Sequence, residues 1–342
     1  MSDGMSVAVV GATGVVGTEA VALLEERGFP VGSLRLMASG RSAGETIGFR
    51  GKDVTIEALA GADFAGIDLI FSAPGASVSL EYVPRAVAAG ALVIDKSSAF
   101  RMAPDVPLVV PEVNGDAASR ETRIIASPNC STIPLVMVLD PLHRRFGIRR
   151  VVVSTYQAVS GAGQKAGDEL IGQTVAILNR RPMPIEVFPH QIAFNCLPQV
   201  ETFDPGLEGY STEEQKVCDE TRKIMGIPDL RITATCVRVP VVNGHSESVN
   251  IEFESPVDPA EARKLLDPMP GIRIVDSPAQ GEYPMAVEAS GLDEVLVGRI
   301  RRDFSVDNGL NLWLACDNIR KGAALNAIQI AERVFGIDPV RS

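Results

Sequence analysis

Residues 6–17 of the chain read SVAVVGATGVVG, and this stretch decides the fold. Its first part, Ser6–Val10, is a short apolar run that predicts a buried strand, while Val15–Arg27 carries apolar residues on one face of a helix. Between them, three glycines recur at the spacing GxxGxxG. A strand, a glycine-rich turn and a helix N-terminus let backbone N–H groups and the helix dipole meet a pyrophosphate. The stretch therefore predicts a dinucleotide-binding turn, and the alternative is a glycine turn without a ligand. The expected contacts are Gly11, Thr13, Gly14, Val15 and Val16.

The end of the next strand indicates which dinucleotide binds. That strand is predicted at Leu34–Ala38, and NAD enzymes commonly end it with an acid on the ribose hydroxyls. Here it runs into Ser39-Gly40-Arg41-Ser42, which offers a guanidinium and two hydroxyls but no acid. These groups suit a 2′-phosphate, so we predict NADP, bound by Ser39, Arg41 and Ser42. The alternative is that Arg41 is a solvated loop cation.

The remaining pattern divides the chain at about residue 130. Before it, strands predicted at Leu69–Ser72 and Ala91–Asp95 flank a helix at Leu80–Ala89, an alternation that predicts a doubly wound parallel sheet. After it, two helices are predicted, at Asp168–Asn179 and Thr212–Met225. Five segments there predict a mostly antiparallel sheet: Val151–Ala158, Arg231–Val239, Glu247–Glu254, Val295–Arg302 and Leu310–Cys316.

A last helix, predicted at Ile319–Phe335, is expected to return to the first domain. The fold class is therefore α/β, with a parallel nucleotide-binding domain and a second α+β domain. We expect an NADP-binding domain at 1–130, completed by residues 319–342, and a second domain at 131–318.

Composition narrows the possible partners and compartment. The formal charge of −11 over 342 residues argues against nucleic acid or an anionic membrane surface as the main partner. No run approaches the ~18 apolar residues of a membrane span, and the first ten residues do not resemble a signal peptide. The five cysteines form no CxxC pair, so neither a disulfide framework nor a metal site is predicted. We expect a cytoplasmic protein.

One cysteine has the setting of a nucleophile. Ser127-Pro128-Asn129-Cys130-Ser131-Thr132 follows a strand-like segment and precedes the apolar run Ile133–Leu139. A cysteine near a helix N-terminus is stabilised as the thiolate that attacks carbonyls. The other four cysteines are better explained as small buried hydrophobes. Of the three histidines, His245 lies in a polar turn between strands, where a side chain can reach a cleft. His245 is therefore the histidine that we predict as the base.

Blocks along nearly the whole chain, from about residue 6 to 335, resemble the aspartate-semialdehyde dehydrogenase family. They include VAVVGATGVVG, ASGRSAG, SPNCST, TYQAVSGAG, TEEQK, CVRVPV, NGHSESV and DNIRKGAALNA. The resemblance implies a Rossmann-type domain completed by the C-terminal helix, and a dimerising catalytic domain, hence a homodimer. It also implies the reduction of L-aspartyl-4-phosphate by NADPH to L-aspartate-4-semialdehyde and phosphate, a step toward lysine, diaminopimelate, methionine and threonine.

The resemblance also implies individual roles. Cys130 would be the nucleophile, His245 the acid/base, and Gln157 the residue that orients the thioester. Arg238 resembles the clamp on the substrate carboxylate, and Glu213 resembles the partner of its ammonium group. The phosphate pocket and the remaining cofactor contacts are carried over in the same way: Lys216, Arg101 and Asn129 for phosphate, and Ser72, Gly75 and Asn318 for the cofactor.

Physical chemistry supports part of this assignment. Glu213 and Lys216 lie three apart on a predicted helix and share a face, although an exposed ion pair is the commoner fate of such a spacing. Arg238 lies in an apolar strand, where a buried guanidinium needs an anionic partner. Two alternatives remain open: an N-acetyl-glutamyl-phosphate reductase, or a non-catalytic NADP-binding regulator. Glu213 disfavours the first, and the pair Cys130 and His245 disfavours the second.

Overall fold

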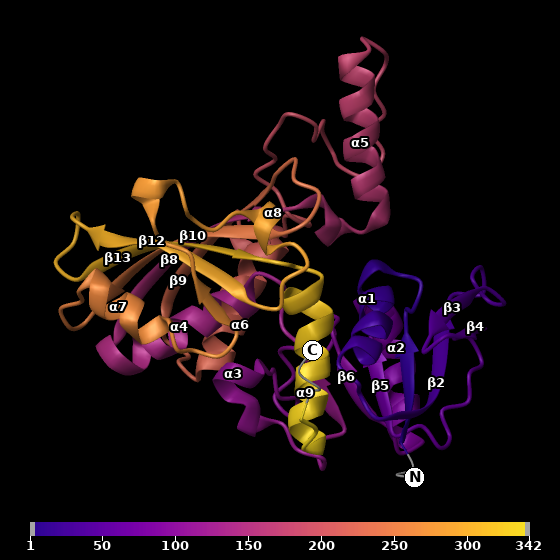
Figure 1. The fold of residues 1–342 in the computed structure, drawn as a ribbon. Coiled ribbons are helices and arrows are strands. Elements are labelled where there is room, and N and C mark those ends of the chain that lie inside the picture. The colour runs from indigo at the N-terminus through magenta and orange to yellow at the C-terminus, as the bar shows by residue number, and fades with distance from the viewer. Residues whose placement is uncertain (1–3, 339–342) are drawn as a thin grey trace. The chain divides into compact units, whose positions relative to one another are not determined.

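The computed structural model describes residues 4–338 and divides the chain into two compact units (Figure 1). The first unit runs to Asn129 and resumes at Ala323, while the second comprises Cys130–Gly322. Residues 1–3 and 339–342, which the sequence prediction assigned to the first domain, lie outside the described residues. No helix within 4–338 is both long and apolar enough to cross a membrane.

The first unit is built on a seven-stranded sheet whose order is β3-β4-β2-β1-β5-β6-β7. All neighbours are parallel except β3 and β4, so the predicted parallel sheet is confirmed. Chain order reverses on either side of β1, and ligands of such sheets bind beyond the carboxyl ends of the strands at this switch point. The strands are β1 (Met5–Val10), β2 (Val31–Ala38), β3 (Thr46–Phe49), β4 (Lys52–Ala58), β5 (Leu69–Ser72), β6 (Leu92–Asp95) and β7 (Ile124–Ala126).

Helices cover this sheet on both faces, as the fully buried strands β5 and β6 require. The C-terminal helix α9 (Leu325–Phe335) shares a hydrophobic core with α1 (Val15–Glu26) and the inner residues of β1. The sequence predicted one helix from residue 319, whereas the structure has a π-helical turn over Arg320–Ala324 before α9 begins. The other helices of this unit are α2 (Ala76–Ala88) and the short α3 (Pro111–Asn114).

The second unit contains a six-stranded sheet in the order β11-β12-β13-β10-β8-β9. The sequence predicted a mostly antiparallel sheet, and the structure is mixed: three pairs are antiparallel, but β8–β9 and β11–β12 are parallel. A parallel pair needs a long crossover, and residues 158–230 supply it with two helices. The strands are β8 (Ile148–Gln157), β9 (Arg231–Arg238), β10 (His245–Phe253), β11 (Ile272–Ile274), β12 (Val295–Asp303) and β13 (Gly309–Cys316).

The helices of the second unit follow from local signals in the sequence. Helix α6 (Thr212–Met225) begins with a capping box formed by Ser211 and Glu214 and ends at Gly226 in the left-handed conformation. Helix α4 (Thr132–Phe146) is buried on all sides over its first eight residues and contacts the sheet and α6. The others are α5 (Gln164–Leu178), α7 (Pro259–Leu266) and the short α8 (Ala286–Ala289).

Candidate active site

Three predicted site residues form a row across one end of the second sheet. Arg238 is the last residue of β9 and pairs in register with Gln157, the last residue of β8. On the other side of β8, Ser246 of β10 pairs with Tyr156, so His245 and Gln157 are the next pair along the same two strands. All three side chains are at most 6% exposed. The sequence placed His245 in a turn, but it is the first residue of β10.

The backbone of Ala158 fixes two of these side chains. Its N–H donates to His245 Nδ1 at 3.0 Å, and its carbonyl oxygen accepts from Arg238 Nη1 at 2.8 Å. Because Nδ1 accepts a hydrogen bond, the neutral imidazole carries its proton on Nε2. Ala158 was not predicted as a site residue, since a backbone contact leaves no signature in residue type.

Gly161 lies against the same pair. A Cβ atom at this position would be 3.0 Å from Arg238 Nη1 and 3.3 Å from His245 Nε2. Gly161 belongs to a short 3₁₀ turn, Val159–Ala162. The N–H groups of Val159 and Ser160 donate to the carbonyl groups of Val241 and Val242, which attaches this turn to the loop before β10. Because residue 161 is glycine, no side chain of this turn presses against the guanidinium or the imidazole.

Burial in the apolar interior lowers the pKa of the Arg238 guanidinium, and the nearby charges of Glu213 and Cys130 oppose this shift. Arginine remains protonated under any ordinary condition. Arg238 is thus a buried cation. Such a cation favours a negative charge beside it, as a clamp for a carboxylate requires.

Cys130 lies in the turn immediately before α4, as predicted, and is partly exposed. The backbone of Gly322 approaches it so closely that a Cβ there would lie 3.1 Å from the Cys130 Cβ. Burial raises the thiol pKa of three other cysteines: Cys218, to about 11, Cys236 and Cys316. Those three are inert, and Cys196 is an exposed surface residue. Cys130 alone combines access with a helix N-terminus.

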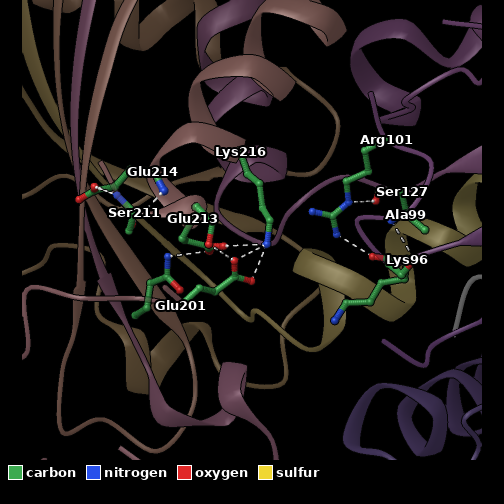
Figure 2. A network of polar contacts seen from close by, with 12 residues as sticks. Lys96, Ala99, Arg101, Ser127, Glu201, Ser211, Glu213, Glu214 and Lys216 are labelled. Carbon is green, nitrogen blue, oxygen red and sulfur yellow. Dashed lines mark hydrogen bonds and ion pairs between the residues drawn. The ribbon is translucent and has the colours of Figure 1, made fainter. Parts of the chain in front are cut away.

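A charged network leads from Gln157 to the first turn of α6. Gln157 Nε2 donates to Glu213 Oε1 at 3.1 Å, and Glu213 Oε2 lies 3.9 Å from Lys216 Nζ. The predicted shared helix face is therefore confirmed. Lys216 Nζ also contacts Glu201 at 2.5 Å (Figure 2). Glu201 was not predicted, because it lies in an irregular loop and meets Lys216 only in the folded chain.

The other two residues assigned to phosphate, Arg101 and Asn129, lie in the first unit and are buried. Arg101 Nε donates to the Ser127 carbonyl at 3.0 Å, and Nη2 donates to the Lys96 carbonyl at 2.6 Å (Figure 2). Backbone carbonyls hold this guanidinium in place. The loop that carries Asn129 is thereby attached to Arg101 within the same unit.

The glycine-rich turn has the geometry of a phosphate-binding loop. Gly11 has φ +80°, a conformation that favours glycine, and a Cβ on Gly17 would lie only 2.2 Å from the Gly11 carbonyl oxygen. Gly14 precedes α1 as its N-cap and is exposed, together with Thr13; Val15 and Val16 form the first turn of that helix and are partly exposed. The turn thus presents backbone N–H groups at a helix N-terminus, which fits a pyrophosphate.

The remaining predicted cofactor residues lie in different settings. Ser39 and Arg41 are exposed just beyond β2, and Ser42 N–H donates to the Ser39 carbonyl at 3.0 Å. Gly75 is the exposed N-cap of α2. Ser72 is buried, with its hydroxyl donating to Asp95 at 2.5 Å.

Asn318 belongs to the second unit and hydrogen-bonds the turn that directly precedes His245. Its Oδ1 accepts from the Gly244 N–H at 3.0 Å, and its Nδ2 donates to Ser160 Oγ at 3.0 Å. It therefore joins the turn before β10 to the turn that carries Gly161. Gly244 itself has φ +88°, and a Cβ there would lie 2.4 Å from the Ala286 carbonyl oxygen.

Comparison with known proteins gives consistent matches over both units. Residues 6–120 match the semialdehyde dehydrogenase NAD-binding domain family, and residues 139–321 match the semialdehyde dehydrogenase dimerisation domain family. The chain is 52% identical to an aspartate-semialdehyde dehydrogenase of Aquifex aeolicus over 333 residues, covering 96% of this chain and 97% of that protein. It is 47% identical to the enzyme of that name from Bacillus subtilis, covering 97% and 98%.

Solved structures agree. The chain is similar to aspartate semialdehyde dehydrogenase II of Vibrio cholerae complexed with ASA, with a TM-score of 0.94, 44% identity and coverage of 98% and 99% of the two chains. It is also similar to the Candida albicans enzyme with NADP, with a TM-score of 0.72, 26% identity and coverage of 96% and 98%.

Proposed function

This chain belongs to the aspartate-semialdehyde dehydrogenase family, and from that premise we propose that it reduces L-aspartyl-4-phosphate to L-aspartate-4-semialdehyde through a thioester on Cys130. The main support is that Arg238, Gln157 and His245 lie in a row at one end of the sheet. The backbone of Ala158 binds His245 and Arg238. A carboxylate clamp, an amide and an imidazole on one sheet edge are the groups that this chemistry needs.

Each residue has a step in this proposal. Cys130 attacks the acyl carbonyl, the bond to phosphate breaks, and a thioester remains on the sulfur. Arg238 grips the substrate carboxylate, and Glu213 binds its ammonium group. A bound nicotinamide cofactor would supply the hydride for the thioester carbonyl; the carbon–sulfur bond then breaks, which releases the aldehyde and restores the Cys130 thiolate. His245 is the acid/base: its neutral ring keeps one proton on Nε2 while Nδ1 accepts from the Ala158 N–H. It takes up the Cys130 thiol proton at Nδ1 when that hydrogen bond opens, and the imidazolium then gives a proton to the departing group.

We propose NADP as the cofactor. Arg41 and the hydroxyls of Ser39 and Ser42 stand beyond the end of β2, where a 2′-phosphate would lie, and this segment contains no acid for the ribose hydroxyls. A relative of the same family was solved with NADP. The family match by itself names only an NAD-binding domain.

A homodimer is the assembly we propose, built on the second unit, which matches a dimerisation domain. The face of the sheet opposite His245 carries an apolar hollow of about 450 Å³ lined by residues that include Ser246, Tyr283, Met285 and Trp313. Two of its lining side chains, Tyr283 and Met285, are exposed hydrophobic residues, which are common at surfaces that contact another protein. A second copy of the chain would bury this hollow.

The cytoplasm is the compartment we propose. All five cysteines lie within the described residues and are free thiols, three of them buried. Thiols persist in this form in a reducing compartment.

The test is an assay of NADP reduction with aspartate semialdehyde and inorganic phosphate, run beside N-acetyl-glutamate semialdehyde. We expect phosphate-dependent turnover with the first aldehyde only, because Glu213 suits a free ammonium and not an acetylated nitrogen. Glu213→Gln should raise KM or slow turnover about fivefold to tenfold, since a neutral partner binds an ammonium more weakly. Preference for the acetylated aldehyde would overturn the proposal.

A further inference from the structure

Lys216, the residue proposed to bind phosphate, is occupied by a carboxylate of the protein itself. Both carboxylate oxygens of Glu201 lie 2.5 Å from Lys216 Nζ (Figure 2). One of them also accepts a hydrogen bond of 2.7 Å from Thr212 Oγ1, at the first position of α6. An ammonium, a hydroxyl and a helix N-terminus are the features that bind an anion.

We propose that Glu201 is an internal competitor of the substrate anion, occupying the place on Lys216 that phosphate takes and leaving before phosphate binds. This inference rests on the proposed role of Lys216. Burial lowers the pKa of Arg238, the other cation assigned to the substrate, and Glu201 is among the acids whose charge opposes that shift. A carboxylate and a phosphate oxygen make the same charge-assisted contacts with an ammonium.

Phosphate can reach Lys216 only where a carboxylate gives up its place. Glu201, Glu213, Lys216 and Arg238 together are neutral, and a phosphate dianion entering this group would meet two carboxylates. Like charges this close disfavour one another. Phosphate therefore binds Lys216 well only after one of the carboxylates has withdrawn.

Glu201 is the more exposed of the two carboxylates and the one that we expect to withdraw. The Glu213 side chain is 4% exposed, belongs to α6 and accepts a hydrogen bond from Gln157, whereas the Glu201 side chain is 42% exposed and lies in a loop. Glu201 also has φ +62°, a left-handed conformation that costs a non-glycine residue free energy. The next residue fixes this arrangement, because the Thr202 carbonyl accepts from the Thr212 N–H at 2.8 Å. Such strain at a site is typical of a segment that changes conformation in function.

The test measures the affinity of the protein for inorganic phosphate, by kinetics and by calorimetry. Glu201→Gln removes the charge and keeps the shape, so KM for phosphate in the oxidative direction should fall about twofold to fivefold, the scale of a partly exposed ion pair. Calorimetric Kd for inorganic phosphate should fall by the same factor. Glu208→Gln is the matched control: it lies in the same loop, is exposed and also has a left-handed φ, of +51°. It should change neither value.

Two further variants make the outcome decisive. In a Lys216→Ala background, Glu201→Gln should no longer change phosphate affinity, since the competitor acts through that ammonium. A rise in phosphate KM with Glu201→Gln would overturn the inference by showing that Glu201 orients Lys216 for phosphate, and no change would reduce the contact to a surface ion pair. If the unmodified protein showed no phosphate-dependent turnover, the proposed function would fail first, which is a separate result.

Discussion

At the scale of single residues, the site depends on groups that contribute no chemistry of their own. Ala158 binds His245 and Arg238 through its N–H and its carbonyl, and Gly161 leaves room for both side chains. Two charged or titratable groups are thereby set side by side at one sheet edge. Positioning of this kind is worth large factors in rate, because a small displacement of a reacting group is costly.

We predict that Gly161→Ala lowers kcat/KM about tenfold or more while the protein stays folded. The backbone of Gly161 is outside the left-handed region, so alanine is tolerated, but its methyl group would push against Arg238 Nη1 and His245. Steady-state kinetics and the unfolding temperature measure the two effects. Gly167→Ala on α5 is the control, since a Cβ there meets open space. Unchanged kinetics in Gly161→Ala would contradict the packing argument.

Cys130→Ser is predicted to reduce turnover to near background while cofactor binding remains, because an alcohol is a far weaker nucleophile than a thiolate at neutral pH. Mild alkylation followed by mass spectrometry should label Cys130 first. Burial raises the thiol pKa of Cys218, Cys236 and Cys316 and protects them, so their labelling rises only at higher pH. Faster labelling of the exposed Cys196 would count against a thiolate at Cys130.

At the scale of helices and strands, periodicity predicted most of the elements, and non-local pairing explains the errors. β5 and α6 have the predicted bounds, because each has a clear apolar pattern and strong end signals. The antiparallel hairpin β3–β4 was not predicted, since its strands are short and half polar. The parallel pairing of β8 with β9 depends on a crossover that no local pattern shows.

The candidate site divides in the same way. Cys130 and His245 stand out in sequence because a nucleophile and a base have distinctive residue types and polar surroundings. Glu201 and Ala158 do not, since one is an acid in an irregular loop and the other acts through its backbone. Their partners, Lys216 and Arg238, meet them only once α6 and β9 have packed.

The segment after β2 carries the cofactor prediction. Arg41→Ala should weaken NADP binding by about 1–3 kcal/mol, the scale of a charge-assisted contact, and leave NAD binding nearly unchanged. Fluorescence titration of the reduced cofactors measures both constants. Equal affinity of the unmodified protein for NADP and NAD would remove the basis for this prediction.

At the scale of the whole molecule, the surface opposite the active site is expected to determine the assembly. Ser246 and Trp313 line the apolar hollow on the outer face of β10 and β13, so the strand that carries His245 on its inner side carries this surface on its outer side. In the proposed dimer, assembly and catalysis would therefore share one sheet. Disturbing the outer face should also affect the inner one.

We predict that Met285→Arg, which adds a second cation to a hollow that Arg299 already lines, converts the proposed dimer into a monomer. Met285 is 37% exposed in the single chain, so a longer polar side chain fits the isolated unit but leaves a buried, unpaired charge when a second copy covers it. Sedimentation velocity measures the molar mass, against 36.3 kDa for one chain. Glu288→Arg, nearby on α8 but outside the residues that line the hollow, is the control and should remain dimeric. Trp313 is the single tryptophan, so its emission should move to longer wavelength as the variant dissociates. A Met285→Arg protein that stays dimeric, with unchanged Trp313 emission, would place the interface on another surface.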